Sequence, residues 1–225
     1  MQSRPILVRR GGDIILPYEE NVVLRPLIIT ALREEFGDRE LPADHSVLFT
    51  GVGKVNAAIA LTRALATTPI SLVINFGTAG AIAPGLEGLH EIAKVLQHDM
   101  IAEPLAPRGK TPFDSCPGSI DSGRTGIVCA TGDRFVTSAD PWLIERKVDV
   151  VDMELFAIAA VCREFKVPWR AFKYVSDKAD SDAANDWQRN VSRGVEEFNE
   201  RLRGDFRGTR GLVEREGIEP STPAL

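Results

Sequence analysis

The sequence has few of the residues that build disulfide frameworks and metal sites. It contains three cysteines (Cys116, Cys129 and Cys162) and three histidines in 225 residues. Their spacing matches neither a disulfide framework nor a zinc motif. We therefore expect reduced thiols, a cytoplasmic location, no metal site and no cofactor.

An excess of positive charge is also absent. The chain has 27 Lys and Arg against 32 Asp and Glu, which gives a formal net charge of -5. The basic footprint typical of nucleic-acid-binding proteins is therefore missing, and we expect no nucleic-acid partner. With 44% hydrophobic and 26% charged residues, the composition is that of an ordinary globular chain with enough apolar material for a core.

Uninterrupted apolar runs are missing as well. The N-terminal region has no continuous apolar stretch, so we expect no signal peptide. Residues 64–86 carry no formal charge and would be long enough to span a bilayer, but two prolines and three glycines interrupt them. We interpret this segment as a helix end, a buried strand and a glycine-rich turn, and we expect no membrane association.

Short apolar runs alternate with helical periodicity along the chain, which favours an α/β fold. The predicted strands are Pro26–Thr30, Ser46–Thr50, Ile70–Phe76, Thr125–Thr131 and Trp169–Val175. The predicted helices are Lys54–Ala66, Asp152–Glu164 and Asp186–Arg203. We divide the chain into an N-terminal extension (1–24), a single domain (25–203) and a polar, aperiodic tail (204–225) that we expect to be disordered.

Acidic residues follow several of the predicted strands. Glu34 and Glu35 come after the first strand, Asp177 after the last, and Glu154 lies in the apolar segment VDMELFAIAAVC. Burying a carboxylate costs several kcal/mol unless it is paired or hydrogen-bonded. For each acid alone, capping of a helix start is the simpler interpretation. In open α/β sheets, ligands bind beyond the carboxyl ends of the strands, so together these acids favour a site.

Two glycine-rich segments are weaker signals. Gly51–Lys54 precedes a helix but lacks the spacing of a P-loop and the third glycine of a dinucleotide fingerprint. Gly77–Gly80 is predicted to be a turn that lets a ligand approach the backbone. No base lies beside a cysteine or serine in the pattern of a nucleophilic triad.

Seven segments, in order, resemble one family. They are LIITALREE, GVGKVNAA, VINFGTAGAIAPGL, the HDM segment, ATGDRFV, VDMELFAIAAVCREFKVP and YVSDKAD, and they span Leu27 to about Trp187. This order is similar to that of the nucleoside phosphorylase superfamily, specifically the 5′-methylthioadenosine/S-adenosylhomocysteine nucleosidases.

The resemblance implies a single-domain three-layer sandwich in which helices flank a central mixed, twisted sheet. It implies hydrolysis of the N-glycosidic bond of 5′-modified adenine nucleosides, with release of adenine. It also implies a homodimer, in which the segment 99–117 lends residues such as Leu105 and Pro112 to the neighbour's pocket.

Five residues receive roles around the sugar from this resemblance. Asp177 matches the acid that protonates the purine at N7, and Glu35 the carboxylate that orients the attacking water. Glu154 matches the acid that binds the ribose hydroxyls, with Met153 packed against the sugar. Thr78 stands where the family usually has a serine near the water. The chemistry has an independent logic, because the base must leave protonated while water attacks the opposite face of the sugar.

Five further residues receive roles around the base and the 5′ substituent. Phe135 matches the aromatic residue that stacks on the base, and Val136 the position whose backbone reads the base edge. Leu32, Val52 and Trp187 fall where the family lines the pocket for the 5′ substituent.

Two other functions stay open at this point. A phosphorylase of the same fold needs fixed positive charge for phosphate, which Arg33 in the first loop could supply, although Asn75 stands where phosphorylases carry arginine. A non-catalytic nucleoside-binding protein on this scaffold would be expected to lack one of the acids, yet Glu35 and Asp177 are both present. Phe156 departs from the family pattern and is predicted to reshape a wall of the pocket.

Overall fold

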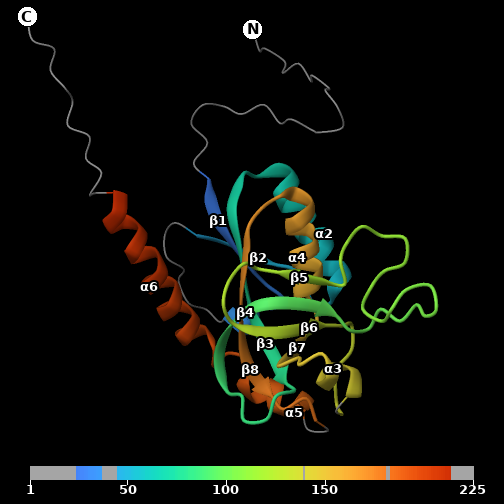
Figure 1. Ribbon diagram of the computed structural model, residues 1–225. Helices are drawn as coiled ribbons and strands as arrows, with labels where there is room; N and C mark the ends of the chain where they lie inside the picture. The colour runs from blue at the N-terminus through green and yellow to red at the C-terminus, as the bar shows by residue number, and fades with distance from the viewer. Residues whose placement is uncertain (1–23, 37–44, 139, 181–182, 214–225) are drawn as a thin grey trace, which may run out of the picture.

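A computed structural model describes residues 24–36, 45–138, 140–180 and 183–213 (Figure 1). Its strands are β1 (Arg25–Thr30), β2 (Ser46–Phe49), β3 (Ile70–Ala81), β4 (Gly88–Gln97), β5 (Ser119–Asp121), β6 (Ile127–Thr131), β7 (Val150–Asp152) and β8 (Trp169–Asp177). Its helices are α1 (Arg33–Phe36), α2 (Lys54–Thr67), α3 (Pro141–Glu145), α4 (Leu155–Phe165), α5 (Ala183–Asn190) and α6 (Val195–Val213). The predicted extension, apart from Leu24, and the tail beyond Val213 lie outside the described residues.

All eight strands form one mixed sheet. The order is β2-β1-β3-β7-β6-β4-β5, and β8 pairs with both β3 and β4. The pairing of β8 closes the ring β3, β7, β6, β4 and β8, so the sheet is partly closed. The sheet contains parallel pairs such as β1 with β3 and antiparallel pairs such as β3 with β7. The predicted mixed sheet is confirmed, whereas the open sheet assumed in placing the ligand site is not.

Helices cover the sheet on both faces, which confirms the three-layer architecture (Figure 1). Helices α2 and α4 pack on one face around Leu61 and Leu155. On the other face, α1 and α6 contribute Phe36 and Phe198 to a second apolar cluster. The Phe198 ring stacks on Phe76 of β3 with centroids 4.4 Å apart. Among the described residues, none of the helices combines the length and apolar character needed to cross a membrane.

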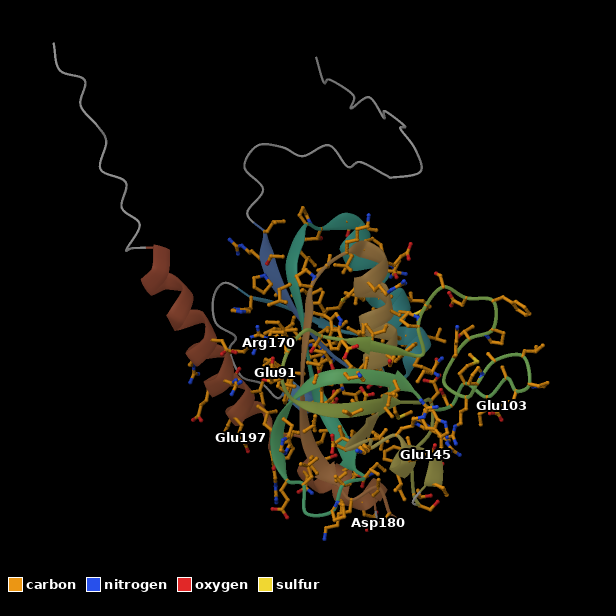
Figure 2. The ribbon with its side chains drawn as sticks, viewed as in Figure 1. Glu91, Glu103, Glu145, Arg170, Asp180 and Glu197 are labelled. Atoms are coloured by element: carbon orange, nitrogen blue, oxygen red, sulfur yellow. The ribbon has the colours of Figure 1, made fainter. Side chains whose placement is uncertain are left out.

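The five predicted strands are all present, but β4, β5 and β7 were not predicted. β4 contains His90, Glu91 and Lys94, so it does not look apolar in sequence. Glu91 is accommodated because the Arg170 guanidinium of β8 donates to it from Nε at 2.8 Å and from Nη2 at 3.2 Å. Figure 2 labels this pair where β4, β8 and α6 meet.

Two predicted helix boundaries are wrong. The helix predicted from Asp152 begins only at Leu155, because Asp152 is the last residue of β7, which pairs with β6 and β3. The helix predicted over Asp186–Arg203 is two helices, α5 and α6. They break before Gly194, which packs so closely on Tyr174 that an added Cβ would lie 2.4 Å from the Tyr174 Cβ.

Helix α6 also runs past Arg203, where the tail was predicted to begin. It continues to Val213, and Asp205 forms an ion pair with Arg170, with Oδ2 2.8 Å from Nη2 of the guanidinium. Arg170 is therefore held between Glu91 of β4 and Asp205 of α6. Residues 204–213, the first part of the predicted tail, are therefore helical.

The predicted turn at Gly77–Gly80 is part of β3, which continues to Ala81. Both glycines are needed because side chains from neighbouring elements approach the strand closely. A Cβ on Gly80 would lie 2.6 Å from Asp177 Oδ1, and one on Gly77 would lie 3.3 Å from Glu35 Oε1. The groups that approach the backbone at these glycines are thus the two acids singled out in the sequence.

Candidate active site

One pocket of about 690 Å³ collects every residue that the sequence placed in the site. Its lining includes Leu32, Glu35, Val52, Thr78, Phe135, Val136, Met153, Glu154, Asp177 and Trp187. It also includes Arg134, Asp152 and Ser176, which were not predicted to line it. The pocket forms where β3, β7 and β8 end and where the segments after β1, β2 and β6 begin.

Glu35 is buried in the first turn of α1, and both of its carboxylate oxygens are bound by donors. Oε2 accepts hydrogen bonds from the Thr30 hydroxyl at 2.9 Å and from the backbone N–H groups of Ala31 and Leu32 at 3.1 Å. Oε1 accepts from the N–H and hydroxyl of Thr78 on β3 at 2.9 and 2.8 Å. These donors hold the carboxyl group in one orientation, facing the pocket.

Asp177 ends β8 on the other side of the pocket. The Ser176 hydroxyl donates to its Oδ2 at 2.8 Å, and the Ala179 N–H donates to its Oδ1 at 2.9 Å. Burial raises the pKa of Asp177 above its ordinary value, and the carboxylates of Asp186 and Asp180 raise it further. A buried acid with a raised pKa keeps a proton more readily, which is what a general acid requires.

Glu35 and Asp177 approach β3 at two different glycines. Glu35 approaches the strand at Gly77 and Asp177 approaches it at Gly80. The two acids therefore meet the pocket at separate positions along the strand, as a reaction needs in which one acid protonates and the other directs water.

Glu154 lies at the start of α4, beside a buried ion pair. Its Oε1 accepts the Gly53 N–H at 2.9 Å. Burial, and then the nearby Asp152 carboxylate, raise the pKa of Glu154 to about 7. The Lys173 ammonium lies 2.7 Å from Asp152 Oδ2, and both side chains are almost fully buried. This pair was not predicted; the signal for it is a lysine in the middle of the predicted strand Trp169–Val175.

The Asp152–Lys173 pair keeps both of its charges despite its burial. Burial alone would raise the pKa of Asp152, but the Lys173 ammonium and hydrogen bonds from Thr131 and Leu155 lower it. Burial likewise works against the charged lysine, and the Asp152 and Glu154 carboxylates raise the pKa of Lys173. The negative charge of Asp152 in turn disfavours ionisation of Glu154 beside it.

The loop with Phe135 and Val136 follows β6 and is held by a polar cluster. Asp99 Oδ2 accepts the Asp133 N–H at 2.8 Å, and Asp99 Oδ1 lies 2.5 Å from the Lys54 ammonium. The Lys54 N–H donates to Asp133 Oδ1 at 2.8 Å. The cluster ties the loop to the Gly51–Lys54 segment, which supplies Val52 and the Gly53 N–H. Gly51 and Gly53 have φ of +80° and +96°, a tight backbone turn that glycine adopts readily.

The wall at the Trp187 end is mainly apolar. Leu32 follows β1, Val52 lies before α2, and Trp187 comes from α5. The Trp187 indole N–H donates to the Thr78 hydroxyl oxygen at 2.9 Å. Helix α5 thereby reaches the residue that contacts Glu35.

Three residues considered from sequence lie outside this pocket. The Asn75 side chain is buried and donates to the Ile29 carbonyl at 3.0 Å, because β3 turns it into the sheet interior. Arg33 is exposed and stacks over the Phe49 ring at 4.5 Å. Phe156 packs in the core, so the prediction that it reshapes a wall of the pocket is wrong.

Capping of helix starts accounts for only part of what the acids do. Glu35 and Asp177 each accept local N–H groups, as capping predicts. Glu35 is also bound by Thr78, from a strand 43 residues away along the chain. Within the described ranges, no group of three or more His, Cys, Asp or Glu side chains is placed to hold a metal ion. The arrangement is that of an α/β enzyme whose pocket holds separated acids, as enzymes that cleave glycosidic bonds have.

Comparisons with known proteins agree with this class. A family model described as the Phosphorylase superfamily matches residues 44–204. A 5′-methylthioadenosine/S-adenosylhomocysteine nucleosidase of Haemophilus ducreyi is 34% identical over 158 residues, which cover 60% of this chain and 68% of that relative. The chain therefore belongs to the phosphorylase superfamily and, within it, to the 5′-methylthioadenosine/S-adenosylhomocysteine nucleosidases.

Solved structures share the fold. The 5′-methylthioadenosine/S-adenosylhomocysteine nucleosidase of Helicobacter pylori superposes with a TM-score of 0.68 at 22% identity, covering 82% of this chain and 98% of that one. A futalosine hydrolase of the same organism has a TM-score of 0.71 at 23% identity, covering 80% and 96%. At this level of identity the likeness concerns the fold alone.

Proposed function

We propose that this protein hydrolyses the N-glycosidic bond of 5′-modified adenine nucleosides, such as 5′-methylthioadenosine or S-adenosylhomocysteine, and releases adenine. The observation that carries the proposal is that Glu35 and Asp177 line one pocket in different surroundings. Five donors hold the Glu35 side chain as an acceptor, and burial raises the pKa of Asp177.

In this mechanism Asp177 donates its proton to the purine at N7 as the glycosidic bond breaks. The base then leaves neutral, and the sugar develops oxocarbenium character. Water, oriented by Glu35, attacks the anomeric carbon from the opposite face. Glu154 in its ionised form accepts hydrogen bonds from the ribose hydroxyls, and Met153 packs against the sugar.

Around the base, Phe135 stacks and the Val136 backbone reads the edge. Phe135 is half-exposed, so its ring is available to a ligand. Leu32, Val52 and Trp187 form the wall for the 5′ substituent. A largely apolar wall suits a thioether better than a free hydroxyl, because an unpaired hydroxyl buried there would lose its hydrogen bonds to water.

Phosphorolysis is disfavoured because the cations around the pocket are engaged by other groups. Phosphate attack requires fixed positive charge beside the sugar. Arg33 stacks on Phe49, and Lys173 is paired with Asp152. Arg134, next to Phe135 in the loop after β6, lies 3.7 Å from Asp140. Among the described residues of the pocket lining, Glu35 is the group beside Thr78, and its negative charge repels phosphate.

Adenine release from a small panel of nucleosides tests the proposed reaction. We expect turnover of 5′-methylthioadenosine and S-adenosylhomocysteine, and weaker turnover of adenosine. Glu35→Gln serves as the control that keeps the shape of the side chain but removes the carboxylate. Tight binding of these nucleosides without any release of base would instead favour the non-catalytic binding protein.

We also propose that the protein is a homodimer. Helix α2 exposes Val55 (67%) and Ile59 (53%), and the segment 99–117 exposes Leu105 (69%) and Phe113 (96%). Apolar surface of this kind is costly to leave in water and is typical of interfaces. In the dimer, residues such as Leu105 and Pro112 of each copy complete the neighbour's 5′ pocket. A monomeric mass at micromolar concentration, with full activity, would contradict this.

We also propose a cytoplasmic location, on the basis of the cysteines. Cys116, Cys129 and Cys162 are all free thiols, which supports a reducing compartment.

A further inference from the structure

The carboxylate of Glu35 has no vacant acceptor position. Oε2 accepts from the Thr30 hydroxyl and from the N–H groups of Ala31 and Leu32, and Oε1 accepts from the N–H and hydroxyl of Thr78. A carboxylate offers about four lone-pair sites. A water that donates a hydrogen bond to Glu35 must therefore replace one of the present donors.

Thr78 supplies the donor that can leave. The three N–H groups are fixed by the backbone of the β1 exit and of β3. The Thr30 hydroxyl is fully buried and does not line the pocket. The Thr78 hydroxyl lines the pocket and can rotate about one bond, so it is the donor that water can displace.

Trp187 determines what the displaced hydroxyl does. An indole N–H is only a donor, so in its 2.9 Å hydrogen bond with Trp187 the Thr78 oxygen is the acceptor. The single hydrogen of the hydroxyl is then left to point at Glu35. When water takes that place, Trp187 keeps the oxygen where it is, and the hydrogen can swing to the water.

We propose that Trp187 is a positioning residue for the attacking water, acting through the Thr78 hydroxyl on Glu35. This inference rests on the proposed hydrolysis at Glu35 and assigns Trp187 a task separate from lining the wall. The ring forms the wall, while the indole N–H fixes the oxygen that receives the water. Because α5 carries Trp187 and β3 carries Thr78, the position of the water depends on α5 lying against the end of the sheet (Figure 1).

Trp187→Phe separates the two tasks, because phenylalanine keeps an aromatic wall but has no N–H. We expect kcat for 5′-methylthioadenosine to fall about fivefold, the effect of one lost hydrogen bond, while KM changes by less than about twofold. Trp142→Phe is the matched control, since Trp142 lies outside the pocket lining and stacks with Arg108 at 4.7 Å. We expect wild-type kcat and KM from it.

A double-mutant cycle shows whether Trp187 acts through Thr78. Thr78→Val removes the hydroxyl and keeps the shape, and we expect it to lower kcat at least as much as Trp187→Phe. In the Thr78→Val background, Trp187→Phe should have no further effect on kcat. Thr78→Ser restores the hydroxyl and should recover most of the turnover, and in that background the effect of Trp187→Phe should return.

The outcomes distinguish this inference from the proposed function. If Trp187→Phe keeps the wild-type kcat, raises only KM, or lowers kcat equally with and without the Thr78 hydroxyl, the inference is wrong. Glu35→Gln is measured alongside. If the wild-type protein releases no adenine from any nucleoside of the panel, the proposed function itself fails. If Glu35→Gln keeps its turnover, the role of Glu35 fails and the inference on Trp187 fails with it. If Glu35→Gln is inactive while Trp187→Phe matches the wild type, only the role of Trp187 is refuted. Each variant is compared at equal folded fraction, measured by thermal melting.

Discussion

Replacing Gly80 by alanine changes the position of Asp177 without touching its chemistry. The new Cβ would lie 2.6 Å from Asp177 Oδ1, whereas ordinary van der Waals contact begins at 3.4 Å. The carboxylate must therefore move by about 0.8 Å. Misplacing a catalytic group by about 1 Å can cost on the order of a hundredfold in rate. We expect kcat of Gly80→Ala to fall by about that factor, with most of its folded stability retained.

The glycines of the chain provide a graded series for this test. At Gly77 the added Cβ would lie 3.2 Å from Lys173 Nζ and 3.3 Å from Glu35 Oε1, so we expect a smaller loss of about tenfold. At Gly204, in α6, a Cβ meets nothing within 4 Å. Gly204→Ala is therefore the matched control and should keep full activity, with a gain of about 0.5–1 kcal/mol in the free energy of unfolding from better helix propensity.

The assay is adenine release, with kcat and KM determined for each variant and thermal melting as the check on folding. We expect the highest kcat from Gly204→Ala, a lower kcat from Gly77→Ala and the lowest from Gly80→Ala. If Gly80→Ala keeps more than about a third of the wild-type kcat, Asp177 either does not need its observed position or is not the acid.

Three further predictions concern single acids. Asp177→Asn keeps shape but has no transferable proton, so kcat should fall about a hundredfold or more while nucleoside binding, measured by calorimetry, survives. The pKa of Glu154 is raised to about 7, and its ionised form is needed to accept hydrogen bonds from the ribose hydroxyls, so kcat/KM should fall as the pH drops through about 7. Glu154→Gln should lose that limb of the pH profile. A wild-type profile that is flat from pH 8 to 5 would contradict the role. Asp205→Ala removes one of the two carboxylates on the Arg170 guanidinium and should lower the free energy of unfolding by about 1 kcal/mol, or about 2–4 °C in melting temperature; no change at low salt would show that α6 is held without that ion pair.

The sequence was most informative where a strand ends. Glu35 and Asp177 were expected in one pocket because acidic side chains at strand exits meet at one edge of a sheet, whereas Thr78 was assigned from the family resemblance. The structure brings all three together. The resemblance to a family added Phe135 and Val136, which no periodicity would have selected. Their placement in the pocket is observed, whereas their roles stay predictions.

What could not be predicted depends on contacts between segments distant in sequence. The pairing of β8 with β4, which closes the sheet, leaves no local signature. The break between α5 and α6 depends on how Gly194 meets Tyr174, a contact that helical periodicity does not report. The strand character of Gly77–Gly80 was hidden for the same reason, since glycine commonly marks turns and here admits the side chains of two acids.

The buried Asp152–Lys173 pair shows a different limit. The sequence shows an aspartate before an apolar helix and a lysine within a predicted strand, and each alone suggests a surface position. Their 2.7 Å contact, together with the hydrogen bonds from Thr131 and Leu155 to Asp152, makes burial of both tolerable. Local sequence patterns therefore located the acids that face the pocket. The buried charges of Asp152 and Lys173 depend on tertiary contacts that those patterns do not report.

The central claim is that water, and not phosphate, attacks the sugar. The most direct measurement follows the sugar product of 5′-methylthioadenosine by mass spectrometry, in phosphate-free buffer and again with millimolar phosphate. Hydrolysis directed by Glu35 predicts free 5-methylthioribose, formed at the same rate in both buffers. A sugar 1-phosphate, or turnover that disappears without phosphate, would contradict it.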